Sequence, residues 1–251
     1  MIYEQPLNEQ ARLCLRLEYL FAQAEHYLAG NSIWDSHQTL KIILEILQAI
    51  DRADFKNKFC QTLNQYAHNL SQLEKSHDVD KQKLNETLKK IDLLIDGLHA
   101  NPKKIGQELR ENEFLATIQQ RLQTPAGTCS FSLPTYHLWL QQDQGLQKKQ
   151  LTSWFNHLSI LKETINVMLE LLRESSVFKQ VEAKDGFYQN NLDANATHQL
   201  IRVNLSPTTN VFPKISVSRY RLAIHFFTLD ISGETTQILD DTVFGLACCK
   251  M

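Results

Sequence analysis

The spacing of the apolar residues changes near Val177, and this change constrains the fold more than any other feature of the sequence. In earlier segments, such as Leu13–Leu28, apolar residues recur every three or four positions, which is typical of amphipathic helices. In later segments, such as Arg219–Phe227, they alternate with polar residues, which is typical of half-buried strands. The sequence therefore predicts an α+β fold, with a large helical domain over residues 8–176 and a smaller, antiparallel β domain over residues 177–251.

Two of the helical segments predict an antiparallel helix hairpin inside a bundle. Apolar residues in Phe55–Leu73 and in Leu84–Leu98 recur with spacings of three and four. This narrow stripe is typical of helices that pack as a left-handed pair, and a short connection between two such helices makes them antiparallel. We expect the two stripes to be core or dimer contacts rather than a cofactor site.

The segment Gln123–Leu140 interrupts the helical pattern. The helix before it is predicted to run unbroken from Ile105 to about Gln123. A short alternating run then predicts a strand over residues 127–133, and Pro134 opens a new helix at a position where its missing N–H costs nothing. We expect residues 127–133, together with residues 1–7, to contribute strands to the sheet of the β domain.

Composition narrows the class of protein. A chain of 251 residues with 43% apolar and 22% charged residues is ordinary for a globular protein with a sizeable core. No apolar run approaches the roughly 18 residues that span a membrane, and the N-terminus lacks the pattern of a signal peptide. The five cysteines are scattered and odd in number, which indicates a reducing compartment. We therefore expect a cytoplasmic protein without membrane association.

No motif for catalysis or for a cofactor is recognisable. The sequence has no glycine-rich phosphate loop, Gly-x-Ser-x-Gly, His-Glu-x-x-His or Cys-x-x-Cys motif. Its nine histidines show no metal-ligand spacing. We therefore expect no enzymatic activity, no cofactor and no metal.

The arginines, in contrast, are gathered in a few segments. Arg12 and Arg16 share one face of a predicted helix. Arg110 and Arg121, eleven residues apart, return to within about 20° of one direction if they share a helix. Guanidinium groups suit carboxylates because their planar fork donates two parallel hydrogen bonds. We therefore expect a groove that binds an extended acidic peptide with an apolar middle and is lined by eight residues: Arg12, Arg16, Arg110, Arg121, His137, Arg202, Arg219 and Arg221.

Three other interpretations fit the same arginines. Single-stranded nucleic acid would need stacking aromatic rings on the same face, and a phosphorylated metabolite would imply an unrecognised enzyme. The arginines could also form only structural ion pairs between the helices and the sheet, because such networks resemble binding sites. The net charge of −2 gives no overall attraction to nucleic acid, so we do not expect that partner. Competition between an acidic peptide and an oligonucleotide would distinguish peptide binding from binding of single-stranded nucleic acid.

Several runs of unusual composition are spread over nearly the whole chain. They are Glu4–Glu9, Leu15–Glu18, Ile105–Arg110, Pro125–Leu140, Gly186–Gln189, Ile201–Leu205, Pro213–Ser216 and Leu246–Cys249. In these runs the sequence resembles the family of the bacterial cell-division protein ZapD, an FtsZ-associated protein.

The resemblance implies a non-enzymatic homodimer with a helical and a β domain. It also implies that the protein binds the C-terminal tail of the tubulin-like GTPase FtsZ and bundles FtsZ filaments at the mid-cell division ring. That tail is short, apolar in the middle and flanked by charge, which agrees with the expected groove. An apolar anchor is expected from Tyr136 or Trp139. By position, the main contacts implied are Arg16, Arg110, Arg121, His137 and Arg221, supported by Arg12, Arg202 and Arg219.

Overall fold

The computed structural model describes the chain except for residues 53, 73–79, 101, 194–195, 219–220 and 251. The chain divides into two compact units. The sheet unit comprises Met1–Leu13 and Leu169–Met251, and the helical unit comprises Cys14–Met168. The division falls inside the first and the last long helix, so each of these helices contributes residues to both units.

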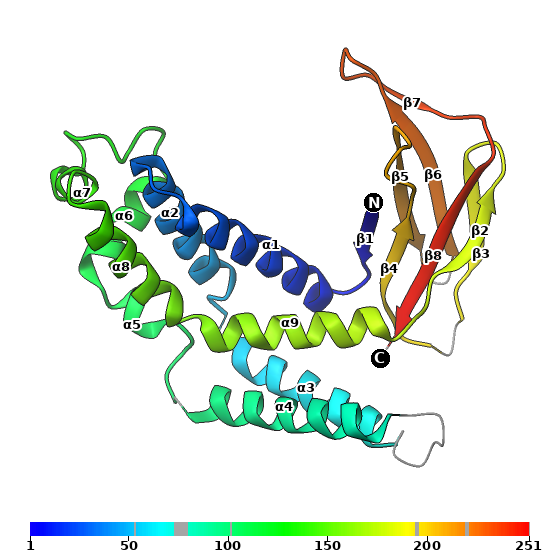
Figure 1. Ribbon diagram of the computed structural model, residues 1–251, viewed down its shortest axis with the longest axis horizontal. Coiled ribbons are helices and arrows are strands. Elements are labelled where there is room, and N and C mark those ends of the chain that lie inside the picture. Colours follow the sequence, from blue (N-terminus) through cyan, green and yellow to red (C-terminus); the bar gives the residue numbers. More distant parts are fainter. Residues whose placement is uncertain (53, 73–79, 101, 194–195, 219–220, 251) are drawn as a thin grey trace. The chain divides into compact units, whose positions relative to one another are not determined.

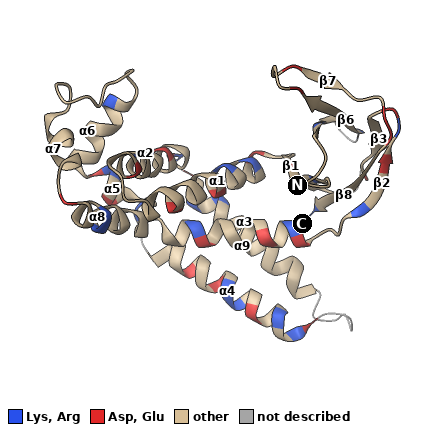
Figure 2. Ribbon diagram, turned by 45° about the horizontal axis from the view of Figure 1, so that its top comes forward, with Lys and Arg blue, Asp and Glu red and all other residues tan. Residues whose placement is uncertain are grey.

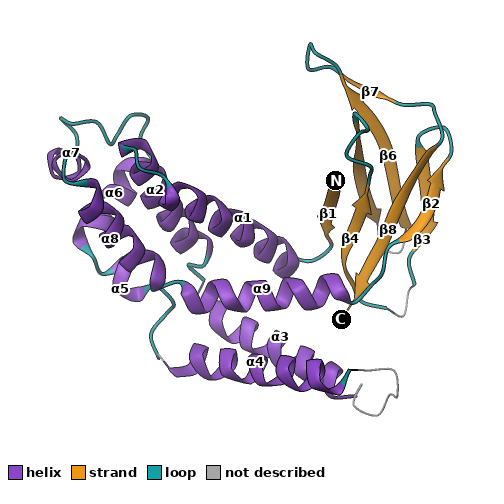
Figure 3. Cartoon of the chain, in the orientation of Figure 1, coloured by secondary structure: helices purple, strands orange, loops and turns teal. Residues whose placement is uncertain are grey.

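Helices follow one another from Glu9 to Glu174, as the sequence predicts (Figure 3). Their bounds are α1 Glu9–Ala29, α2 Ile33–Ala49, α3 Phe55–Ser71, α4 Lys81–Ala100, α5 Gln107–Arg110, α6 Glu113–Leu122, α7 Pro134–Leu140, α8 Gln144–Asn156 and α9 Ser159–Glu174. Local capping explains where the first two begin. The side chain of Asn8 accepts a hydrogen bond of 2.7 Å from the Ala11 amide, and Ser32 forms a capping box with Asp35. Within the described residues, no helix has the length and apolar content needed to cross a membrane.

The predicted hairpin is confirmed in the helical unit. Figure 1 shows α3 and α4 side by side and running in opposite directions. Leu63 and Tyr66 of α3 are buried, as are Ile91 and Leu98 of α4, so the apolar stripes do form core. Figure 2 shows acidic and basic residues interspersed along α4, and among them Lys89, Lys90 and Asp92 are exposed.

The unbroken helix predicted from Ile105 to Gln123 is wrong, because the chain forms two helices here. Gly106 enters the first, α5, with a φ of 70°, and α5 ends at Arg110. Asn112 then begins α6, because its side chain accepts a hydrogen bond of 3.1 Å from the Leu115 amide. Arg110 and Arg121 therefore belong to different helices, so the single helix on which their expected shared direction depended is not formed.

The strand expected over residues 127–133 is not formed either. This stretch is a series of turns, drawn as loop in Figure 3. The Cys129 carbonyl accepts hydrogen bonds of 3.0 Å from the amides of both Ser132 and Leu133, and the Cys129 amide donates to Ala126. These backbone groups are satisfied locally, so they do not extend a sheet. Pro134 begins α7, as predicted.

The strands form two antiparallel sheets in the sheet unit. The first sheet has the order β1–β4–β8–β2, and the second has the order β3–β6–β5 with β7 also paired to β6. Their bounds are β1 Ile2–Pro6, β2 Lys179–Ala183, β3 Phe187–Asn191, β4 His198–Asn204, β5 Val211–Ser218, β6 Arg221–Leu229, β7 Thr235–Gln237 and β8 Thr242–Lys250. Tyr3 pairs with Val203, so the N-terminal residues join the first sheet through β4.

The two sheets share one apolar core. Leu222, Ile224 and Phe226 of β6 are fully buried and cluster with Ile201 of β4 and Phe244 of β8. The alternation predicted for Arg219–Phe227 is confirmed over the part that is described, because Arg219 and Tyr220 lie outside the described residues. One face of each sheet therefore turns inward, and the pattern is that of a β-sandwich.

Candidate functional site

The predicted site residues are distributed over both units. Arg219 lies outside the described residues. The sheet unit contains Arg12, Arg202 and Arg221. The helical unit contains Arg16, Arg110, Arg121 and His137.

Arg202 is held inside the sheet unit by an ion pair. Its Nε donates to Oε1 of Glu4 at 2.9 Å, while Nη2 of Arg173 donates to Oε2 of the same carboxylate at 2.7 Å. The Arg202 guanidinium also lies 5.0 Å from the centre of the Phe178 ring. Arg202 and Glu4 are only 14% and 15% exposed, so this arginine ties β1 to β4 rather than facing solvent.

Two opposing effects set the pKa of Glu4. Burial raises it, because the charged carboxylate loses solvation. Hydrogen bonds and positive charge from Arg173 and Arg202 lower it, and together they leave the pKa below its ordinary value. Glu4 is therefore ionised at neutral pH and neutralises part of the charge of its two arginines.

Arg110 is likewise held by partners within the protein. Its Nη2 donates a hydrogen bond of 2.6 Å to the carbonyl of Leu47, near the end of α2, and its Nη1 lies 3.6 Å from Asp51. The last carbonyls of a helix lack partners within the helix, and a cation there also suits the helix dipole. With 17% of its side chain exposed, Arg110 acts as a cap for α2.

Arg12 is held more weakly. It forms an ion pair with Glu9, which lies one turn earlier on α1, and the two side chains are 37% and 73% exposed. Exposed pairs of this kind contribute little free energy, because both charges remain solvated. Arg12 can therefore exchange Glu9 for another carboxylate at small cost.

The remaining four residues keep their charge or polarity available. Arg16, Arg121, His137 and Arg221 are all exposed. Arg221 donates a hydrogen bond of 2.6 Å to the side-chain oxygen of Gln189, which is a neutral amide, and no carboxylate of the described residues forms an ion pair with it. Within the described parts of the chain, no ion pair joins Arg16, Arg121 or His137 to a carboxylate.

Tyr136 and Trp139 are core residues, which corrects the expectation that one of them anchors a ligand. Their exposures are 1% and 5%, and their rings stack with centroids 5.8 Å apart. The Tyr136 hydroxyl lies 2.7 Å from Nδ1 of His37, and Trp139 Nε1 donates to Gln150. The sequence run was right in its apolar content but did not reveal which side of α7 faces inward.

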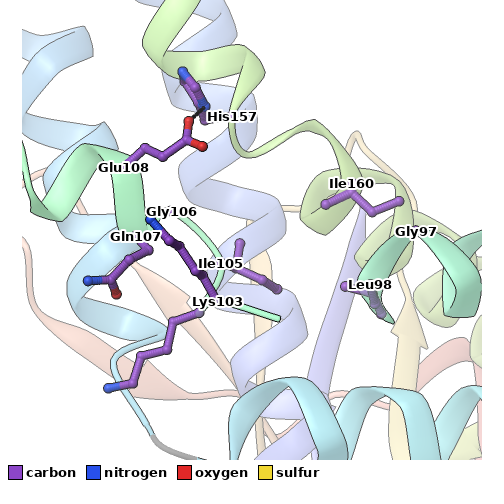
Figure 4. Close-up of a pocket in the computed structure, with 10 residues that line it drawn as sticks. Gly97, Leu98, Lys103, Ile105, Gly106, Gln107, Glu108, His157 and Ile160 are labelled. Carbon is purple, nitrogen blue, oxygen red and sulfur yellow. Dashed lines mark ion pairs between the residues drawn. The ribbon is translucent and has the colours of Figure 1, made fainter. Parts of the chain in front are cut away.

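One small pocket lies in the helical unit where α4, α5 and the start of α9 meet (Figure 4). Its volume is about 90 Å³, room for a few water molecules and no peptide. Figure 4 shows His157 turned toward Glu108, and their Nδ1 and Oε2 atoms are 3.0 Å apart. Lys104, also in the lining, lies 3.7 Å from Asp51. These pairs leave little charge for a ligand, so the pocket is a helix junction.

A larger cavity, of about 400 Å³, lies in the sheet unit. Arg12, His198 and Val217 line it, together with the chain from Gln5 to Leu7. Both ring nitrogens of His198 are buried and lack a hydrogen-bond partner within the described residues. No sequence pattern singles out His198, because a missing partner is a property of tertiary structure. Among the described residues, no cluster of His, Cys, Asp and Glu could hold a metal ion.

Comparison with known proteins identifies relatives over the full length. The family model of the cell division protein ZapD matches residues 15–225. The chain is 40% identical to the cell division protein ZapD of Coxiella burnetii, over 99% of this chain and 97% of the relative. It is 34% identical to the ZapD of Methylococcus capsulatus, over 100% and 98%, and 32% identical to that of Shigella flexneri, over 99% and 98%.

Proposed function

The chain belongs to the ZapD family of cell division proteins, and from this membership we propose that it binds the C-terminal tail of FtsZ and bundles FtsZ filaments at the division septum. Its role is that of a non-enzymatic adaptor that acts as a homodimer at the mid-cell ring. Each protomer docks one tail, and the two tails of a dimer come from different filaments.

The observation that carries the proposal is the uncompensated charge of Arg221. Its guanidinium has a neutral amide as its partner and remains exposed, so a carboxylate gains a charge-assisted hydrogen bond there without first displacing an acid. Within the helical unit, the exposed Arg16, Arg121 and His137 are candidate contacts of the same kind. Arg110 and Arg202 instead stabilise the helical unit and the sheet unit, respectively, because each is already paired with a carboxylate.

The apolar middle of the tail requires apolar surface. Phe131 and Leu138, which lie on either side of the start of α7, are 87% and 65% exposed. They take the place of the buried Tyr136 and Trp139 as anchors in the proposal. Burial of these two rings also favours a peptide over single-stranded nucleic acid, which would stack on exposed aromatic surface.

Bundling follows from the number of docking sites in a dimer. A dimer with two docking sites joins two filaments without any new contact between the filaments themselves. Each site can then be weak, which suits a ring that assembles and disassembles, while many tails along a filament keep the bundle together.

Charge reversal tests the site. We expect Arg221→Glu and Arg16→Glu each to weaken co-sedimentation with FtsZ filaments by tenfold or more, because a bound carboxylate would then face a carboxylate. The matched control is Lys90→Glu, which makes the same change on the exposed face of α4 and should bind as the wild type does.

Truncation of the partner tests the ligand. In a pull-down, FtsZ without its last fifteen or so residues, roughly the reach of one extended peptide, should no longer retain this protein. Retention by truncated FtsZ would contradict tail binding. Unchanged co-sedimentation of both arginine variants would contradict the assignment of the contacts but not of the partner.

A further inference from the structure

The edge strand β5 presents unpaired backbone groups, and the register shows which residues carry them. The Phe226 amide donates to Gly186 at 2.9 Å, and the Phe226 carbonyl accepts from Ile238 at 3.1 Å. Both groups therefore point away from β5. Phe226 pairs with Pro213, so this pair is not hydrogen-bonded. In an antiparallel ladder, the residues that alternate with hydrogen-bonded ones direct their backbone groups outward.

Pro213, Ile215 and Val217 consequently direct their backbone groups toward the free edge of β5. Pro213 has no N–H, which discourages pairing at that point, as proline commonly does on edge strands. Ile215 and Val217 keep both N–H and C=O, and no other described backbone group bonds to them on that side. The half of β5 nearer its C-terminal end can therefore accept an extended peptide.

This open half adjoins the cavity of about 400 Å³, because Val217 lines it. On the other side of the cavity, Leu7 donates its amide to the Gln199 carbonyl, which places Leu7 on the paired side of β1. The neighbouring Pro6 thus faces outward and offers no N–H. A strand entering here would accordingly pair with β5 rather than with β1.

The cavity also contains groups that select a carboxylate. Among the described residues, neither buried ring nitrogen of His198 has a partner, and a buried polar atom in that state is costly until a ligand bonds to it. Arg12 supplies a cation that its exposed pairing with Glu9 holds only weakly. A carboxylate fits these groups, because its oxygens accept hydrogen bonds from a guanidinium and from an imidazole N–H.

We propose that an extended segment of the FtsZ tail adds as a strand to β5 at Ile215–Val217 and places one carboxylate in the cavity beside Arg12 and His198. The inference rests on the proposed function for its partner. It adds a docking mode, in which main-chain hydrogen bonds supply affinity and the cavity supplies selectivity.

The test measures fluorescence anisotropy of a labelled synthetic peptide that comprises the last fifteen or so residues of FtsZ. We expect Ile215→Pro to weaken binding about fivefold, because it removes one outward N–H and no bond to β6. Ile215→Val, which keeps the amide, is the matched control and should bind as the wild type does. His198→Ala and Arg12→Gln should each weaken binding about tenfold.

A second measurement leaves the protein unchanged. Peptides N-methylated at one residue at a time should lose affinity at every second position over the paired segment, because only alternate amides of an added strand face β5. Equal affinity for all methylated peptides, or full binding by both Ile215→Pro and His198→Ala, would overturn this docking mode while tail binding stands. Failure of the wild type to bind the unmodified peptide would overturn the proposed function as well.

Discussion

Arginine side chains in this protein differ by what lies within reach of each guanidinium. Arg202 and Arg173 share the half-buried carboxylate of Glu4, whereas Arg221 donates to the neutral amide of Gln189. Removal of one member of a buried ion pair is destabilising, because it leaves the partner's charge desolvated and unpaired. Arginine thus forms a structural ion pair in one place and is a candidate contact for a partner in another.

Glu4→Gln is expected to lower the free energy of unfolding by about 3 kcal/mol at pH 7, because Arg173 and Arg202 lose their common carboxylate. The pKa of Glu4 is lower in the folded protein than its ordinary value of 4.5. Its contribution to stability is therefore fully present above that value and is lost as the pH falls through the lower, folded pKa.

Urea unfolding followed by circular dichroism at pH 7 and at progressively lower pH measures this difference. We expect the gap between wild type and Glu4→Gln to shrink with acidification. The control Glu182→Gln removes an exposed carboxylate of β2 and should change stability little at either pH. A gap that stays constant with pH would contradict the role assigned to the ionised carboxylate.

At the scale of elements, the run Ile105–Arg110 packs against the end of α2 and caps it. Gly106 has a φ of 70°, and a Cβ placed on it would lie 2.3 Å from Cδ2 of Leu47. Four residues later, Arg110 donates to the carbonyl of the same Leu47. The glycine permits the close approach and the arginine caps the helix, so this run has a structural explanation that needs no ligand.

Arg110→Ala should therefore lower the free energy of unfolding by about 2 kcal/mol, because a carbonyl of α2 loses a charged donor. Arg121→Ala, the matched control, removes an exposed arginine from the end of α6 and should change stability by no more than about 0.5 kcal/mol. Thermal unfolding of both variants checks this contrast. Equal stability of the two would show that Arg110 does not cap α2.

At the scale of the whole molecule, the proposed function depends on two docking sites in one dimer. A bivalent linker joins filaments best when each of its sites finds a different filament. When the docking sites of the added dimers outnumber the FtsZ tails, most dimers bind a tail through one site only. The cross-links between filaments are then lost.

We therefore expect light scattering by FtsZ filaments to rise with added protein, pass through a maximum and fall at a several-fold molar excess over FtsZ. A synthetic tail peptide in excess should dissolve the bundles by occupying the sites. The control peptide has the same composition in scrambled order. Scattering that stays at its plateau at high excess would contradict cross-linking by a bivalent dimer.

Much of the fold was predictable because the signals are local. The stripe in Phe55–Leu73 predicts the buried face of α3, and the alternation in Arg219–Phe227 predicts which side of β6 faces the core. The errors are also local in cause. Asn112 satisfies an amide of α6 with its side chain and divides one expected helix, and the turns around Cys129 satisfy the backbone of an expected strand.

The candidate site was less predictable. By itself, the sequence determined the two classes of element, the core-facing residues of regular elements such as α3 and β6, and the family, since periodicity and motifs depend only on neighbours along the chain. Only the tertiary structure decided that Glu4 pairs with Arg202, that the Leu47 carbonyl accepts from Arg110, and that His198 lacks a partner among the described residues. The physical reason is that pairing and desolvation depend on distances between residues that are far apart in sequence.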